Sequence, residues 1–434
     1  MALVEIFNVE QAKSISRGLT GSRLDRPAPG DTSESYVLEL QGRIPAQNSG
    51  VQCVELLAGE RVMRSIPLST PRGGPVAMFW GKSSRFECGF QALVGAVGLD
   101  RTFDLDVCAL HNNQTRTPLF RLQGRHCGIQ SAFQPRIRPL VVTSLGRSGS
   151  TWLMRLLVEH PHIVAPQVYP YEIRAGRYWM QALQVLTEPT NALQSSTPDG
   201  LSPNQWWVGN HPFYRAPLTD HPELFRWFSK AYTEQAAAFC LQSTDGFYQQ
   251  IAHAQGKNDA VYFAEKNQPD RAAALLCELC PDAREVFLVR DFRDMMCSIR
   301  AFNARRGRDD FGRSLVKDET EFLSLVSKRV NRFLRHWQSR AGPAHLVRYE
   351  DLIARPEETV SAMLAFLGLD AGTATLEQMI CSAAADIAEF ERHSTSSDPL
   401  TTVGRWKVDL NAEERVAMTT AFAEPLEAFG YPAE

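Results

Sequence analysis

One segment decides the architecture that we expect for this chain of 434 residues: Pro139-Leu-Val-Val-Thr-Ser-Leu-Gly-Arg-Ser-Gly-Ser-Thr-Trp-Leu-Met-Arg-Leu156. Its apolar beginning predicts a short buried strand, and the amphipathic pattern from Ser150 onward predicts a helix. Between them lies the loop Gly146–Thr151, whose two glycines allow a tight turn that exposes successive backbone N–H groups. The following helix adds unpaired donors and the positive end of its dipole. The sequence therefore predicts a phosphate or sulfonate cradle, to which Arg147, Ser150 and Thr151 can donate.

The order of a short strand followed by a helix recurs along the second part of the chain. This alternation is typical of a parallel sheet with helices on both faces. We therefore predict an α/β fold with a P-loop-like parallel sheet from residue 136 to residue 434. The expected strands are Leu140–Ser144, Val261–Ala264, Val286–Val289 and His345–Val347, and the expected helices include Glu319–Arg340, Glu357–Leu367 and Asn411–Phe429.

The first part of the chain follows a different pattern. Between residues 35 and 130, short alternating runs such as Tyr36–Leu40 and Phe103–Leu110 are separated by Gly, Pro, Asn and Asp. This pattern predicts an all-β, sandwich-like accessory domain. Residues 1–34 are interpreted as an N-terminal extension of it.

An aromatic-rich segment interrupts the α/β pattern at about residues 171–250, and we expect it to be mostly helical. One interpretation is a helical cap with its own apolar core. The other is that some of its rings, especially those in Trp206–Tyr214, line a substrate cleft.

Composition and charge narrow the class of protein. The 46 Lys and Arg residues against 49 Asp and Glu residues give a formal net charge of −3, which argues against a globally basic nucleic-acid-binding protein. The longest apolar runs, such as Val286–Val289, are far shorter than the roughly 20 residues that cross a bilayer. No signal-peptide pattern is visible, so we expect a soluble, cytoplasmic protein.

Nine scattered cysteines favour reduced thiols, and no spacing of Cys and His predicts a metal site.

A second group of charged residues follows another predicted strand. Arg290 stands at the carboxyl end of Val286–Val289, where ligands bind in open α/β sheets. Ser298, eight residues later, lies on the next predicted helix and can approach the same anion. The loop at Gly146–Thr151 is not a Walker A motif, because it lacks the lysine of that motif. Two anion sites on one sheet indicate a nucleotide that carries phosphates at both ends.

These motifs resemble those of sulfotransferases that use 3′-phosphoadenosine 5′-phosphosulfate (PAPS). Arg147-Ser-Gly-Ser-Thr-Trp-Leu153 is similar to their 5′-phosphosulfate loop, and the segment Leu288–Ser298 is similar to their 3′-phosphate motif. Two later segments, Val347–Leu352 and Val403–Lys407, follow in family order, so the resemblance covers about residues 138–425 and makes residues 136–434 the sulfotransferase domain. The nucleotide-binding residues that it implies are Arg147, Ser148, Gly149, Ser150, Thr151, Trp152, Arg290, Ser298, Tyr349, Gly404, Arg405, Trp406 and Lys407.

The resemblance is greatest to the tyrosylprotein and related bacterial sulfotransferases, in which a Glu-x-Arg follows the loop and a lysine ends the next strand. Here these are Glu172, Arg174 and Lys266. The resemblance implies that Glu172 is the general base. The nearby Tyr169, Tyr171 and Tyr178 suggest a partly apolar surrounding, which would raise its pKa. The alternative is a surface Glu172 that pairs with Arg174 or Arg177. Lys266 and Arg147 are expected to stabilise charge on the leaving phosphate. No metal is expected in this reaction.

The resemblance thus implies transfer of a sulfuryl group from PAPS to an acceptor hydroxyl on a glycan, a phenol or another small molecule. The β domain favours a glycan, and no nucleic acid or membrane partner is expected. Two alternatives stay open from the sequence: an ATP-dependent kinase with an atypical phosphate loop, and a non-catalytic carbohydrate-binding protein. The acceptor and the oligomeric state are not specified by the sequence.

Overall fold

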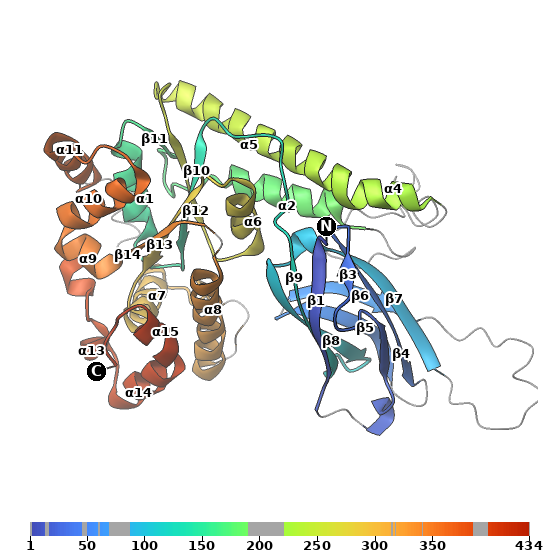
Figure 1. The fold of residues 1–434 in the computed structure, drawn as a ribbon. Helices are drawn as coiled ribbons and strands as arrows, with labels where there is room; N and C mark the ends of the chain where they lie inside the picture. Colours follow the sequence, from blue (N-terminus) through green and yellow to red (C-terminus); the bar gives the residue numbers. More distant parts are fainter. Residues whose placement is uncertain are drawn as a thin grey trace, which may run out of the picture. The chain divides into compact units, whose positions relative to one another are not determined.

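The computed structural model describes residues 2–13, 17–45, 50–59, 61–68, 87–189, 221–313, 316, 318–340, 342–384 and 398–433 (Figure 1). The chain divides into two compact units. The first comprises Met1–Phe133 and Met180–Cys240, and the second comprises Gln134–Trp179 and Leu241–Glu434. The chain passes from one unit to the other three times: between Phe133 and Gln134, within helix α2 (Ala175–Thr187) and within helix α5 (Thr233–Ala254).

The first unit contains two antiparallel sheets. One has six strands in the order β3-β1-β9-β8-β5-β6, and the other has three in the order β2-β4-β7. Buried and exposed residues alternate along β8 in particular, as expected for strands with one face on a core. The strands are β1 (Val4–Gln11), β2 (Arg23–Arg26), β3 (Thr32–Ser33), β4 (Val37–Pro45), β5 (Val51–Ala58), β6 (Arg61–Pro67), β7 (Glu87–Gly95), β8 (Thr102–His111) and β9 (Arg116–His126).

The segment expected to be an N-terminal extension takes part in these sheets. Strand β1 pairs with β9 and β3, and β2 pairs with β4. Short 3-10 turns accompany the strands at Arg17–Leu19 and Ala96–Gly98. Two further helical segments, α4 (Pro222–Arg226) and η4 (Trp227–Tyr232), belong to the same unit. The expected cleft segment Trp206–Tyr214 lies outside the described residues.

The second unit contains a five-stranded sheet in the order β11-β12-β10-β13-β14, and every pair in it is parallel. This confirms the α/β prediction. Strand β10 is buried at every residue after its first, as expected for a parallel strand covered on both faces. The strands are β10 (Arg138–Ser144), β11 (Ile163–Val164), β12 (Tyr262–Asn267), β13 (Arg284–Val289) and β14 (Ala344–Arg348).

Alternate residues of this sheet face two separate apolar cores. Val286 and Leu288 pack with helices α1, α9, α10 and α11, whereas Phe287 and Val289 pack with α7, α8, α14 and α15. The predicted helix Asn411–Phe429 is observed as two shorter helices. The helices of this unit are α1 (Ser150–Glu159), α6 (Arg271–Leu279), α7 (Phe292–Arg306), α8 (Glu319–Ser339), α9 (Tyr349–Ala354), α10 (Pro356–Leu367), α11 (Thr373–Ala384), η5 (Pro399–Thr402), α13 (Trp406–Asp409), α14 (Ala412–Ala421) and α15 (Ala423–Ala428).

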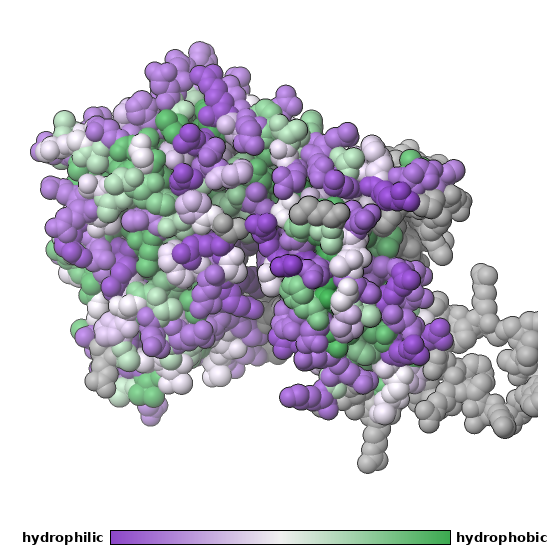
Figure 2. All heavy atoms as spheres, viewed as in Figure 1, coloured by the Kyte–Doolittle hydropathy of each residue, from purple (hydrophilic) through white to green (hydrophobic). Residues whose placement is uncertain are grey.

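Hydrophilic residues predominate on the face shown in Figure 2, and hydrophobic residues form scattered patches there. Among the described residues, no helix is both long and apolar enough to cross a membrane. The structure describes all nine cysteines and joins none of them in a disulfide.

A lysine holds the carboxyl end of helix α1, the end opposite to the loop at Gly146–Gly149. The ammonium group of Lys257 donates to the carbonyl oxygens of His160 at 3.0 Å and Ile163 at 2.7 Å, and also to that of Val158. The His160 ring accepts the N–H of His162 at Nδ1, and its Nε2 lies 3.2 Å from the carbonyl oxygen of Asp370. These contacts place both histidines just after the end of α1.

We predict that Lys257→Met lowers the free energy of unfolding by about 2–4 kcal/mol, because several helix-end carbonyls lose a charged donor. Denaturant unfolding followed by circular dichroism measures this loss. Lys328→Met, at an exposed lysine of α8, is the matched control and should change stability by less than about 0.5 kcal/mol. Equal stability of the two variants would contradict the prediction.

Candidate anion site at the carboxyl ends of the parallel strands

The loop between β10 and α1 has an unusual backbone conformation. Arg147 and Gly149 both have positive φ angles, of +69° and +87°. A Cβ atom on Gly149 would overlap the ring of Tyr349, so this position needs glycine for its space as well as its φ angle. The first N–H groups of α1 have no partners within the helix and stand at this loop. The anion cradle that the sequence predicts at this loop and helix start stays a prediction.

The other residues of this loop differ in exposure. Ser148 and Ser150 are buried, whereas Thr151 and Trp152 are half-buried. The hydroxyl group of Ser148 lies 4.0 Å from the sulfur of Met295, and the guanidinium of Arg155 lies 6.0 Å from the centre of the Trp152 ring. These side chains are placed at the start of α1, and their role in binding an anion stays a prediction.

Arg147 extends from the loop to helix α7. Its Nε atom donates to the hydroxyl oxygen of Ser298 at 3.2 Å, and its guanidinium lies 4.6 Å from the centre of the Phe302 ring. Burial, followed by the positive charge of Arg290, lowers the pKa of Arg147 to about 10. Two residues from separate motifs, Arg147 and Ser298, thus meet, and the charge of Arg290 lies near enough to act on Arg147.

Arg290 lies just after the carboxyl end of β13 and is buried. It donates to the carbonyl oxygens of Arg147 at 3.2 Å and Thr402 at 2.6 Å, and its guanidinium lies 4.5 Å from the centre of the Tyr349 ring. The Tyr349 hydroxyl in turn lies 3.0 Å from the hydroxyl oxygen of Thr402. Among the described residues, no acceptor reaches the buried Nε of Arg290. One donor of this arginine is therefore available for a further oxygen atom.

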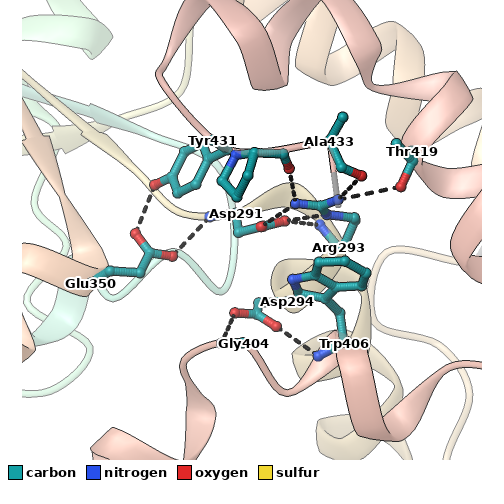
Figure 3. A network of polar contacts seen from close by, with 10 residues as sticks. Asp291, Arg293, Asp294, Glu350, Gly404, Trp406, Thr419, Tyr431 and Ala433 are labelled. Atoms are coloured by element: carbon teal, nitrogen blue, oxygen red, sulfur yellow. Dashed lines mark hydrogen bonds and ion pairs between the residues drawn. The ribbon is translucent and has the colours of Figure 1, made fainter.

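The segment Gly404–Lys407, which includes the first two residues of α13 and is called the late basic loop below, is attached to helix α7. The backbone N–H groups of Gly404 and Trp406 donate to the two carboxylate oxygens of Asp294, at 2.7 and 2.8 Å (Figure 3). The Trp406 ring is buried, and the Arg293 guanidinium lies 3.7 Å from its centre. Trp406 therefore contributes to an apolar core.

The two basic side chains of this loop lie nearer the surface. Arg405 pairs with Asp409 at 2.6 Å, and the ammonium of Lys407 lies 5.5 Å from the centre of the Trp406 ring. The charge of Arg405 also contributes to the lowered pKa of Arg147. The late basic loop is thus electrostatically coupled to the phosphate loop.

The three residues predicted on the acceptor side, Glu172, Arg174 and Lys266, come together. The carboxylate of Glu172 pairs with the ammonium of Lys266 at 2.6 Å and with the guanidinium of Arg174 at 2.9 Å. Arg174 also donates from Nε to the carbonyl oxygen of Lys266 at 3.0 Å. Burial lowers the pKa of the Lys266 ammonium.

The expected partly apolar surrounding of Glu172 is not observed. Its side chain is 30% exposed, and both carboxylate oxygens contact cations. Lys266 lies on a buried strand next to Glu172, and the short segment that contains Arg174 folds back on that strand. The pair with Arg174 is the alternative that the sequence left open, whereas the local sequence around Glu172 gives no sign of the contact with Lys266.

A neighbouring carboxyl group, Glu265, has the surrounding that was expected for Glu172. It is buried, and it accepts the N–H of Gly176 at 2.8 Å and the hydroxyl of Tyr248 at 2.9 Å. Burial raises its pKa to about 7. The sequence signal for this group is a carboxyl residue directly after the apolar beginning, Tyr262–Ala264, of strand β12.

Asp294 and Thr402 were missed by the sequence analysis. Asp294 lies between Arg293 and Met295 on the buried side of α7. A carboxylate in such a position needs hydrogen-bond partners, and this is the signal that could have pointed to it. No local signal marks Thr402, which contributes its backbone carbonyl. Across the described part of the chain, no group of three or more His, Cys, Asp and Glu side chains is placed to hold a metal ion.

Comparisons with known proteins identify the family of this chain. The model of the sulfotransferase family matches residues 139–374, which is more than half of the chain. The chain therefore belongs to the sulfotransferase family, as the four motifs predict. Among solved structures, the crystal structure of sulfotransferase STF9 from Mycobacterium avium matches with 16% sequence identity and a TM-score of 0.35, over 69% of this chain and 78% of that chain. No curated protein matches this chain.

We predict that Gly149→Ala destabilises the second unit by at least about 1–2 kcal/mol, because alanine is strained at a positive φ and its Cβ meets the Tyr349 ring. Thermal unfolding of the full chain measures the change. Gly146→Ala is the control in the same loop: its Cβ would lie 3.4 Å from the Phe311 ring, an ordinary contact, and its φ is not positive. A Gly149→Ala variant as stable as Gly146→Ala would argue against the loop geometry.

Proposed function

We propose that the second unit binds PAPS and transfers its sulfuryl group to an acceptor hydroxyl. The observation that supports this most strongly is Arg290, whose buried Nε has no acceptor among the described residues. Arg290 donates to the carbonyl oxygen of Arg147, and the side chain of Arg147 in turn contacts Ser298. A buried guanidinium donor without an oxygen partner is unfavourable, and a phosphate oxygen is a suitable acceptor for it.

The residues of the site fit a nucleotide with anionic groups at both ends. The N–H groups at the start of α1, with Arg147, Ser150 and Thr151, are donors for a 5′-phosphosulfate. Arg290 and Ser298 are donors for a 3′-phosphate, and the remaining predicted nucleotide residues, Ser148, Gly149, Trp152, Tyr349, Gly404, Arg405, Trp406 and Lys407, surround these two groups in the proposal. The lowered pKa of Arg147 supports it, because an anion relieves the repulsion from Arg290.

PAPS supplies a transferable sulfuryl group and a phosphate leaving group. In the proposed reaction, Glu172 accepts the proton of the acceptor hydroxyl at one carboxylate oxygen. Its contacts with Lys266 and Arg174 hold the carboxylate in place. Lys266, with 12% of its side chain exposed, and Arg147 stabilise negative charge that develops on the leaving oxygen. Charge stabilisation by preorganised cations is strongest where water is excluded.

The acceptor in this proposal is a hydroxyl group of a glycan, a phenol or another small molecule. The two antiparallel sheets of the first unit serve as a sandwich-like accessory domain, which favours a glycan. The segment that includes residues 171–250 contributes Glu172 and Arg174 to the acceptor side of the site.

The first test of the donor compares adenosine 3′,5′-bisphosphate, AMP and ATP with magnesium by thermal shift and calorimetry. We expect the bisphosphate to bind without magnesium and, at 100 times its Kd, to stabilise the protein by about 2.7 kcal/mol. Arg290→Ala should weaken bisphosphate binding about 10- to 100-fold, the equivalent of a lost charged hydrogen bond, and leave AMP nearly unchanged.

Arg284→Ala, at the opposite end of β13, is the matched control and should bind like the wild type. Equal affinity of the wild type for AMP and the bisphosphate would remove the 3′-phosphate site. Preference for ATP with magnesium would favour a kinase.

The second test concerns the proposed base. Glu172→Gln keeps the shape of the side chain but cannot accept the proton, so we expect turnover to fall about 100- to 10,000-fold. Bisphosphate affinity should stay within a few-fold of wild type, because Glu172 is not among the nucleotide residues. Sulfation of a phenol or an oligosaccharide that the wild type accepts is the measurement.

The exposed Glu357→Gln on α10 is the matched control and should leave both properties unchanged. Near-normal turnover of Glu172→Gln would falsify the assignment and make Glu265 the next candidate. Loss of nucleotide binding instead would show that Glu172 has a structural role.

A further inference from the structure

One buried carboxylate fastens the late basic loop to the strand-end arginine motif. Asp294 accepts the N–H of Gly404 with one oxygen and the N–H of Trp406 with the other (Figure 3). Both distances, 2.7 and 2.8 Å, are those of strong hydrogen bonds to a charged acceptor. An asparagine in its place has only one oxygen, so the two bonds require the carboxylate.

The neighbouring residues of the same motif attach to adjacent parts of the loop. Arg290 donates to the carbonyl oxygen of Thr402, and the Arg293 guanidinium stacks on the ring of Trp406. Three residues of one five-residue motif thus contact the backbone or ring of the segment 402–406. Between these fixed points lies Arg405, whose charge reaches Arg147.

Arg293 is itself held firmly, which makes it a rigid platform. It forms two hydrogen bonds to the carboxylate of Asp291 and further bonds to the carbonyl oxygens of Pro432 and Ala433 (Figure 3). The backbone N–H of Asp291 donates to Glu350, which also accepts the hydroxyl of Tyr431. The motif therefore cannot shift without breaking contacts with the last residues of the chain.

The ionised form of Asp294 does not serve stability. Within the described residues it forms no ion pair, and burial raises its pKa to about 6. The charges that face it are the carboxylate of Asp291, which raises the pKa, and the guanidinium of Arg290, which lowers it. Because the folded carboxyl holds its proton up to a higher pH than the unfolded one, stability falls as the pH rises from about 4 to 6.

We infer that Asp294 is a positioning residue, which holds the backbone of the loop Gly404–Lys407 so that Arg405 and Lys407 face the bound nucleotide. This inference rests on the proposed function, because it assigns those two side chains to a nucleotide with a 3′-phosphate. Asp294 acts through the loop and does not touch the nucleotide.

The test compares wild type, Asp294→Asn and a matched control, Asp318→Asn, in the full chain. Asp318 caps α8 by accepting the N–H of Glu321 at 2.8 Å, so the control makes the same chemical change at backbone amides outside this network. Trypsin cleaves after Arg405 and Lys407, which makes cleavage at these residues a direct readout of loop order without any ligand. Calorimetry with adenosine 3′,5′-bisphosphate and with AMP gives the affinities.

We expect Asp294→Asn to be cleaved at Arg405 and Lys407 at least about tenfold faster than wild type. Its bisphosphate Kd should rise about tenfold while its AMP Kd stays within about twofold, and Asp318→Asn should match wild type in all three. In the double variant Asp294→Asn/Arg405→Ala, the two losses of affinity should not add, because one acts through the other.

If Asp294→Asn is cleaved at the wild-type rate and binds the bisphosphate with wild-type affinity, this inference is overturned, whereas the proposed function is not. If the wild type itself does not bind the bisphosphate, the proposed function fails and this inference fails with it, so the two failures are distinguishable. Should Asp294→Asn not fold, Asp294→Glu replaces it in the same measurements. It keeps both oxygens on a longer side chain that displaces the loop, and the same faster cleavage and weaker binding are expected.

Discussion

A buried guanidinium must be surrounded by oxygen atoms, and the position of Arg290 imposes this requirement at the carboxyl end of β13. Two loops that are far apart in sequence meet it, since the carbonyl oxygens of Arg147 and Thr402 both accept from this side chain. The ring of Tyr349 closes a third side and also forces position 149 to be glycine. The phosphate loop, helix α9 and the late basic loop are thus arranged around one arginine.

Much of this arrangement is predictable from the sequence because its signals are local. The apolar run before Gly146 and the amphipathic run after it define a strand, a loop and a helix within about 20 residues. Arg290 is predictable for the same reason, because it ends a strand and parallel strands bring their carboxyl ends to one edge. The family match over residues 139–374 agrees with these local signals.

The parts that could not be predicted depend on contacts between distant segments. Asp294 meets two N–H groups about 110 residues later in the chain, and nothing near either segment encodes that pairing. One of the two cations that contact Glu172 is Lys266, which lies on strand β12. The tyrosines near Glu172 in the sequence therefore suggested an apolar surrounding that the structure does not have. The strands β1 and β2 were not predicted, because these short segments contain too many polar residues to show a clear alternation of apolar and polar side chains.

The order of the strands in the parallel sheet has a consequence for synthesis of the protein. Strand β10 is central, yet its two neighbours, β12 and β13, begin at residues 262 and 284, long after β10 ends at residue 144. At about 5–20 residues per second, a ribosome needs roughly 6–24 seconds to reach β12. During that interval an apolar strand with two unpaired edges has been made without its partners. Until β12 is made, helix α1, which directly follows β10 and shares its apolar core, is the first element of the finished fold that can cover this strand.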